Sequence, residues 1–138
     1  MRYLAIDPGA RRTGLAVGDD ETGIASPLEV IDTASEVERM RRIHSVIASE
    51  EPDALVLGLP FNMDGSEGPA AKRARTYAAV LSEATGLHVH LADERLTSAV
   101  ADEQMARTGL THKQKKQLRD ALAAAALLRS FLAERRGD

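Results

Sequence analysis

The sequence predicts an α/β fold: a five-stranded mixed sheet, covered by helices. Three short apolar runs near the N-terminus are separated by short connections, which is typical of antiparallel hairpins. Beyond residue 33, helical patterns alternate with two further apolar runs, and this alternation adds parallel strands and covering helices to the sheet. At 138 residues the chain has the size of one domain, so we expect residues 1–138 to form a single unit.

The three N-terminal strands are expected at residues 3–7, 14–18 and 23–30. The first run ends in Asp7, and the Pro8-Gly9 pair that follows marks a turn. Pro27 interrupts the third run. Because proline cannot donate a hydrogen bond to a neighbouring strand, we expect this third strand at an edge of the sheet.

Helical signals begin after the third strand. Thr33 and Glu36 form a capping box ahead of apolar residues at helical spacing, and Pro52 ends that helix. The continuous apolar run at residues 54–59 predicts a parallel strand covered on both faces. Pro69 suits the start of a second helix and Gly86 its end.

The C-terminal third continues the alternation. Alternating apolar residues at 87–91 predict a strand that ends at Asp93 and Glu94. Thr97 or Ser98 can cap a helix that Gly109 ends, and residues 116–135 form a last helix rich in Ala and Leu. Three antiparallel strands followed by parallel strands and helices fit a ribonuclease-H-like architecture.

Carboxylates stand where this architecture places chemistry. Asp7 ends the first strand, and the Asp93-Glu94 pair ends the fifth; open α/β sheets hold their sites at such ends. Alternation puts only one of that pair toward a shared site. Asp120 lies on an apolar helical face, where a carboxylate is costly to bury unless it is paired or binds a metal. Lys116, four residues earlier, is the alternative partner for Asp120.

Three carboxylates from two strand ends and one helix can form an oxygen-only cation site. Such ligands suit Mg²⁺ or Mn²⁺, which can activate water and stabilise the leaving oxygen in phosphodiester hydrolysis. Basic and amide side chains near these motifs are candidates for holding a phosphate backbone. These candidates are Arg11, Arg12, Asn62, Arg73, Arg75, Arg95, Lys113, Lys115, Lys116 and Arg119.

The composition narrows the class of protein. The chain has no cysteine, which excludes disulfides, thiolate catalysis and cysteine-bound metal centres. Eighteen Lys and Arg against 21 Asp and Glu give a net charge of -3, which argues against broad, charge-driven coating of nucleic acid. The start of the chain lacks a signal-peptide pattern and no apolar stretch could span a membrane, so we expect a cytoplasmic protein with no membrane partner.

With these motifs in view, the sequence resembles the YqgF (RuvX-like) family of Holliday-junction resolvases and pre-16S ribosomal RNA nucleases. The resemblance spans almost the whole chain, and its motifs occur in family order. They are residues 7–17, Gly58-Leu-Pro-Phe-Asn-Met-Asp-Gly65, Ala74-Arg75, Asp93-Glu-Arg-Leu-Thr97 and Asp120-Ala-Leu-Ala-Ala124. The second and fourth segments are specific in combination.

The resemblance implies a ribonuclease-H-like, metal-dependent nuclease. It suggests Asp7, Glu94 and Asp120 as catalytic and metal-binding carboxylates, with Asp93 as the alternative to Glu94. It also implies Mg²⁺ or Mn²⁺ as cofactor and either branched DNA or precursor ribosomal RNA as substrate. Pro8 departs from the larger apolar residue frequent in the family and makes this turn look more like that of RuvC-type resolvases.

Other assignments stay open at this point. A junction resolvase needs paired cuts, so the DNA substrate would call for a homodimer. A non-catalytic RNA-binding or transcription-associated factor could keep the same fold, although all three carboxylates are intact. An actin-like phosphotransferase shares the Asp-x-Gly and Thr-Gly pattern, but that fold needs a far longer chain.

Overall fold

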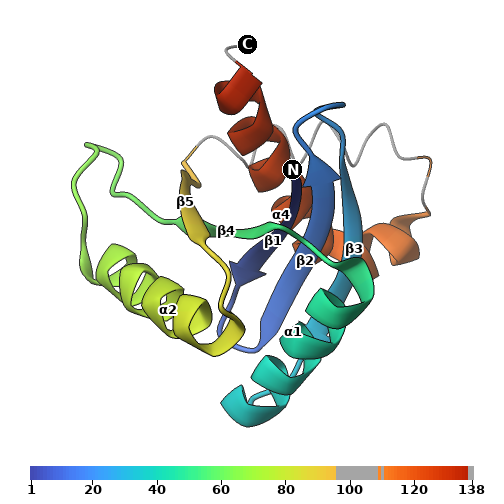
Figure 1. Cartoon of the computed structure of the whole chain (residues 1–138), viewed down its shortest axis with the longest axis horizontal. Helices are drawn as coiled ribbons and strands as arrows, with labels where there is room; N and C mark the ends of the chain where they lie inside the picture. The colour runs from blue at the N-terminus through green and yellow to red at the C-terminus, as the bar shows by residue number, and fades with distance from the viewer. Residues whose placement is uncertain (96–108, 110, 137–138) are drawn as a thin grey trace.

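Five strands form one mixed sheet in the computed structural model, which describes residues 1–95, 109 and 111–136 (Figure 1). The strand order across the sheet is β3-β2-β1-β4-β5. The β1/β2 and β2/β3 pairs are antiparallel, and β1/β4 and β4/β5 are parallel, as the sequence predicts. The strands are β1 (Arg2–Pro8), β2 (Arg12–Asp19), β3 (Ala25–Asp32), β4 (Ala54–Leu59) and β5 (Val89–Asp93).

Helices cover both faces of this sheet. Helices α1 (Glu36–Glu50) and α2 (Pro69–Thr85) lie on one face, and α4 (His112–Arg136) lies on the other (Figure 1). None of the helices in the described part of the chain is long and apolar enough to cross a membrane. The arrangement confirms the ribonuclease-H-like layout expected from the order of the elements.

Side-chain alternation along the central strand builds two separate cores. Tyr3 and Ala5 of β1 point toward α4 and pack with Ala124 and Leu128. Leu4 and Ile6 of β1 point to the opposite side, where they pack with α1 and α2. The buried face of α4 combines small residues such as Ala121 and Ala124 with larger ones such as Leu128 and Phe131.

Most expected elements are confirmed, but the N-cap of α1 and the start of α4 differ from the prediction. The edge position predicted from Pro27 is confirmed, since β3 is the outermost strand. The expected cap at Thr33 is wrong: Ser35 is the N-cap of α1, and its hydroxyl accepts from the N–H of Glu38 at 3.1 Å. Thr33 instead accepts from the N–H of Ser35 at 3.0 Å, so the chain turns once more before the helix begins.

The last two predicted helices are those near the C-terminus. Helix α4 begins at His112, about one turn before the predicted residue 116. The helix predicted between Thr97 or Ser98 and Gly109 lies outside the described residues, apart from Gly109 itself.

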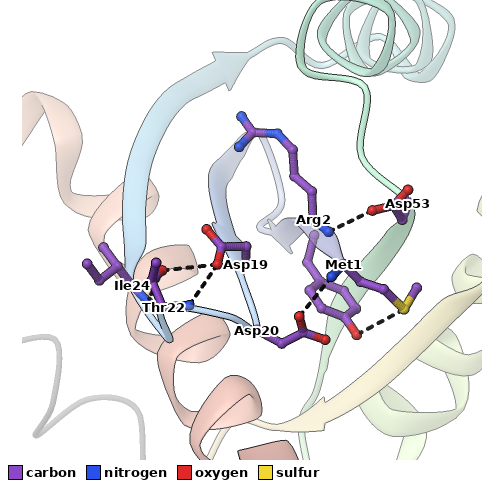
Figure 2. Close-up of polar contacts among 8 residues, drawn as sticks. Met1, Arg2, Asp19, Asp20, Thr22, Ile24 and Asp53 are labelled. Atoms are coloured by element: carbon purple, nitrogen blue, oxygen red, sulfur yellow. Dashed lines mark hydrogen bonds and ion pairs between the residues drawn. The ribbon is translucent and has the colours of Figure 1, made fainter.

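The amino end of β1 is fixed by acids from two connections. The N-terminal ammonium binds Asp20 at 2.8 Å, and the N–H of Arg2 donates to Asp53 at 2.8 Å (Figure 2). Asp19 closes the β2–β3 turn by accepting from the N–H of Thr22 at 2.8 Å. These contacts hold the end of the sheet opposite to the predicted carboxylate site.

Candidate functional site

Asp7 lies at the carboxyl end of the central strand, between two glycines of the neighbouring strands. In β2 its register partner is Gly14. In β4 the last paired position is Leu57 opposite Ile6, so Gly58 comes next beside Asp7. Asp7 shares the face of Tyr3 and Ala5, so its carboxyl group points to the α4 side of the sheet.

Glu94 reaches Asp7 by passing over Gly58. A Cβ atom built on Gly58 would lie 2.6 Å from Cδ and 2.7 Å from Cγ of Glu94. The backbone N–H of Glu94 donates to the carbonyl of Leu59 at 3.3 Å, which fixes the end of β5 against β4. Glycine at position 58 therefore creates the space in which a carboxylate from one strand meets a carboxylate from another.

Asp120 enters from α4 where that helix comes nearest to β2. A Cβ atom on Gly14 would overlap the carbonyl of Asp120 and lie 2.9 Å from the nitrogen of Ala121. The Asp120 carboxylate pairs with Nε of Arg12 at 3.2 Å. The alternative pairing with Lys116 is wrong, because among the described residues the ion pair of Asp120 is made by Arg12 of β2.

The environment of Asp7 disfavours its ionised form. Burial raises the pKa of Asp7 to about 8, together with a hydrogen bond to Glu94 and the negative charges of Glu94 and Asp120. A carboxyl group held in this way is protonated near neutral pH unless a cation joins the cluster. The three predicted carboxylates are thus electrostatically coupled, which their separation in sequence alone did not show.

Asp93 belongs to a different interaction. Its carboxylate accepts from Nε and Nη2 of Arg95 at 3.0 and 2.7 Å. The hydrogen bond to Arg95 holds the pKa of Asp93 below its ordinary value. The guanidinium of Arg95 also lies 5.2 Å from the ring centre of Phe61. Of the two neighbouring acids, Glu94 is the one beside Asp7.

The residues predicted to contact phosphate differ in the partners that they have in the structure. Four arginines are held by carboxylates: Arg11 by Asp32, Arg12 by Asp120, Arg75 by Glu67 and Arg95 by Asp93. Asn62 donates to the hydroxyl of Ser66 at 2.9 Å within the β4–α2 loop. The remaining predicted contacts make no ion pair with the described residues: Arg73, Lys113, Lys115, Lys116 and Arg119. Lys115 is half-buried, and the other four are exposed.

Sequence reasoning missed two features of the site. The first is the steric role of Gly14 and Gly58, which the spacing of glycines in two neighbouring strands could have signalled. The second is a cavity of about 570 Å³ that opens beside Glu94 and is lined by Arg39 and Tyr77. Nothing in the local pattern of α1 or α2 indicates that these two side chains approach the site.

The carboxylates fit a divalent cation by their chemistry. Mg²⁺ and Mn²⁺ prefer oxygen ligands, and the clustered charge that raises the pKa of Asp7 is what a cation would offset. Within the described residues no group of three His, Asp or Glu side chains is already arranged so that it could hold a metal ion. Asp7 and Glu94 are in contact, whereas the carboxylate of Asp120 is turned to Arg12.

Relatives of similar length match most of the chain. A "Putative pre-16S rRNA nuclease" of Anaeromyxobacter sp. is 39% identical over 132 residues, which cover 96% of each chain. The protein of the same name from Thiobacillus denitrificans is 43% identical over 128 residues, covering 93% of this chain and 88% of the relative.

Two solved structures are similar to this chain over nearly its whole length. Thermus thermophilus RuvC in complex with a Holliday junction substrate aligns with a TM-score of 0.59 and 26% identity, covering 99% of this chain and 96% of RuvC. The Fowlpox virus resolvase in complex with its junction aligns with a TM-score of 0.62, covering 98% and 99% of the two chains. At 12% identity, this second likeness shows the fold alone.

The family is settled by a match over nearly the whole chain. The sequence model described as "RuvX: Holliday junction resolvase" matches residues 1–134, a span that includes Asp7, Glu94 and Asp120. This chain belongs to the RuvX (YqgF) family.

Proposed function

We propose that this chain is a divalent-metal-dependent nuclease that hydrolyses phosphodiester bonds in structured nucleic acid. The observation that carries the proposal is the meeting of Asp7 and Glu94 over Gly58, within the electrostatic reach of Asp120. The likeness to RuvC bound to a junction and the names of the curated relatives support the same chemistry.

The residues that would hold the cation, Mg²⁺ or Mn²⁺, are Asp7, Glu94 and Asp120. When bound, such a cation polarises a phosphoryl oxygen and makes a water molecule more acidic. Asp7 is the group that gives up a proton as the cluster becomes fully ionised, because its pKa is about 8. Glu94 keeps Asp7 oriented through their hydrogen bond.

Arg12 connects the carboxylates to the surrounding basic side chains. Its guanidinium is more than half exposed while it pairs with Asp120, so it can contact a phosphate oxygen of the substrate. Arg73, Lys113 and Lys116 are exposed cations, and we propose that they contact phosphates farther along the strand. These contacts position a strand without reading its bases.

The substrate divides between two candidates. The complex of RuvC favours a four-way DNA junction, and the names of the curated relatives favour the precursor of 16S ribosomal RNA. Resolution of a junction needs two cuts, so that function would also require a homodimer with one site in each subunit.

A paired cleavage assay tests the proposal. Purified protein is incubated with Mg²⁺ or Mn²⁺ and offered both a four-way DNA junction and a precursor 16S RNA terminus. We expect Asp7→Asn to abolish cleavage of the preferred substrate while substrate binding is retained. Asp93→Asn is the matched control, since Asp93 pairs with Arg95 outside the cluster. Undiminished cleavage by Asp7→Asn would contradict the proposal.

A further inference from the structure

A cavity lies between α1 and α2, at the edge of the sheet where Glu94 stands. Its volume of about 570 Å³ exceeds what one planar nucleobase needs. Small and apolar residues form much of its wall, including Pro8, Pro60 and Ala70. Glu94 therefore faces two spaces: the carboxylate cluster and this cavity.

Two polar side chains form part of the cavity lining: Arg39, which is buried, and Tyr77, which is half-buried. Arg39 is only 3% exposed, and its guanidinium binds the carboxylate of Glu36 and the carbonyls of Arg11 and Thr33. Its Nε atom and the hydroxyl of Tyr77 have no hydrogen-bond partner among the described residues. Burial raises the pKa of the Tyr77 hydroxyl, and the nearby charge of Arg39 opposes that rise. Buried groups of this kind are ordinarily satisfied.

The cavity continues along α2. A second cavity of about 340 Å³ shares Arg73 and Tyr77 with the first, and it extends to Lys72 and Thr76. Lys72 and Arg73 are exposed. A polymer that entered beside Glu94 would therefore pass an aromatic ring and then two cations.

The charged side chains that line the first cavity balance one another. Glu36 is paired with Arg39, and Arg73 lines the same cavity as Glu94. A neutral base would leave this balance unchanged, whereas a phosphate group would add negative charge beside Glu94. Unpaired bases are commonly bound against an aromatic ring, with polar groups at their edges and cations along their phosphates.

We propose that the cavity between α1 and α2 receives one unpaired nucleobase of the bound strand, and that Tyr77 and Arg39 lie beside that nucleobase. The flanking phosphates run past Arg73 and Lys72. Placing this base next to the phosphate that is cut rests on the nuclease function proposed above. The substrate class is then a structured nucleic acid that carries an unpaired nucleotide at the cleavage position.

Binding of nucleotides tests the cavity without any cleavage. Ala70 is exposed and lines the cavity, whereas Ala79 is exposed on the same helix and lines neither cavity. The probes are uridine and adenosine 5′-monophosphate, with inorganic phosphate for comparison, followed by NMR chemical shifts of the full chain. We expect both nucleotides to shift residues of α2 around Tyr77, and Ala70→Trp to weaken that binding about tenfold or more. Ala79→Trp should bind as the parent chain does.

Other outcomes overturn the inference. Equal shifts with inorganic phosphate would show a phosphate site, and no shifts with any probe would show no site. Tyr77→Phe keeps the ring and removes the unpartnered hydroxyl, so it should fold normally and bind the nucleotides more weakly. Unchanged binding by both Ala70→Trp and Tyr77→Phe would contradict the proposal.

Cleavage assays separate this inference from the proposed function. If the parent chain cuts neither substrate but Ala70→Trp still weakens nucleotide binding, the nuclease proposal fails and the base site stands. If Ala70→Trp and the parent cut an unpaired-nucleotide substrate equally well, the base site fails and the nuclease proposal stands. Replacing that nucleotide by an abasic residue should slow cleavage by the parent chain and have less effect on Ala70→Trp.

Discussion

Replacing Asp7 by Asn should stabilise the metal-free protein above neutral pH. In the folded chain, burial and the neighbouring carboxylates raise the pKa of Asp7 from 3.8 to about 8. Between these two values the unfolded chain has lost a proton that the folded chain retains. The free energy of unfolding therefore falls as pH rises from about 4 to about 8. An Asn amide at position 7 carries no charge and can still donate to Glu94, so the variant avoids that loss.

The difference in pKa sets a ceiling of roughly 5–6 kcal/mol on this contribution above pH 8. Water near the half-buried carboxyl screens its neighbours, and single substitutions seldom exceed a few kcal/mol, so we expect about 1–3 kcal/mol. For a chain of this size that corresponds to a rise in Tm of about 3–10 °C. Near pH 4 the two proteins should melt at nearly the same temperature.

Thermal unfolding in EDTA from pH 4 to pH 9 measures the effect directly. Asp93→Asn is the matched control, because its pairing with Arg95 lowers its pKa instead of raising it. That control should be neutral or slightly destabilising at every pH above 4. The reasoning is refuted if Asp7→Asn lowers Tm at pH 8.5 or if its effect does not depend on pH.

Two further substitutions test the surroundings of the cluster. Gly58→Ala places a methyl group against the Glu94 carboxylate. We expect Mn²⁺ affinity and the cleavage rate to fall at least about tenfold, while circular dichroism still reports a folded chain. Mn²⁺ binding equal to that of the parent chain would contradict the steric role of Gly58. Arg12→Ala removes an exposed ion pair with Asp120, so the free energy of unfolding should change by less than about 1 kcal/mol. In a filter-binding assay, the affinity for substrate should fall and should depend less steeply on salt concentration.

Much of the architecture follows from local patterns. Short connections and the proline in β3 predict three antiparallel strands and their edge, because these signals act over a few residues. The cap of α1 is decided between Ser35 and Thr33 by how the preceding turn closes. Both hydroxyls are chemically able to cap, so sequence alone favours the wrong one.

The carboxylates were predictable as candidates, but their interactions were not. An acid at a strand end or on an apolar helical face stands out without coordinates, as Asp7 and Asp120 do. Glu94, and not Asp93, lies beside Asp7 because Asp93 pairs with Arg95 and because Gly58 leaves room for the Glu94 side chain. These are contacts between neighbouring strands, and no local pattern encodes them.

Mn²⁺ binding most directly tests whether these carboxylates form one site. Isothermal titration of the parent chain with Mn²⁺ should show binding that releases a proton near pH 7, because Asp7 is protonated in the metal-free protein. Asp7→Asn, Glu94→Gln and Asp120→Asn should each weaken binding about tenfold or more, and Asp93→Asn should leave it unchanged. Parent-like Mn²⁺ affinity in all three of the first variants would contradict the account.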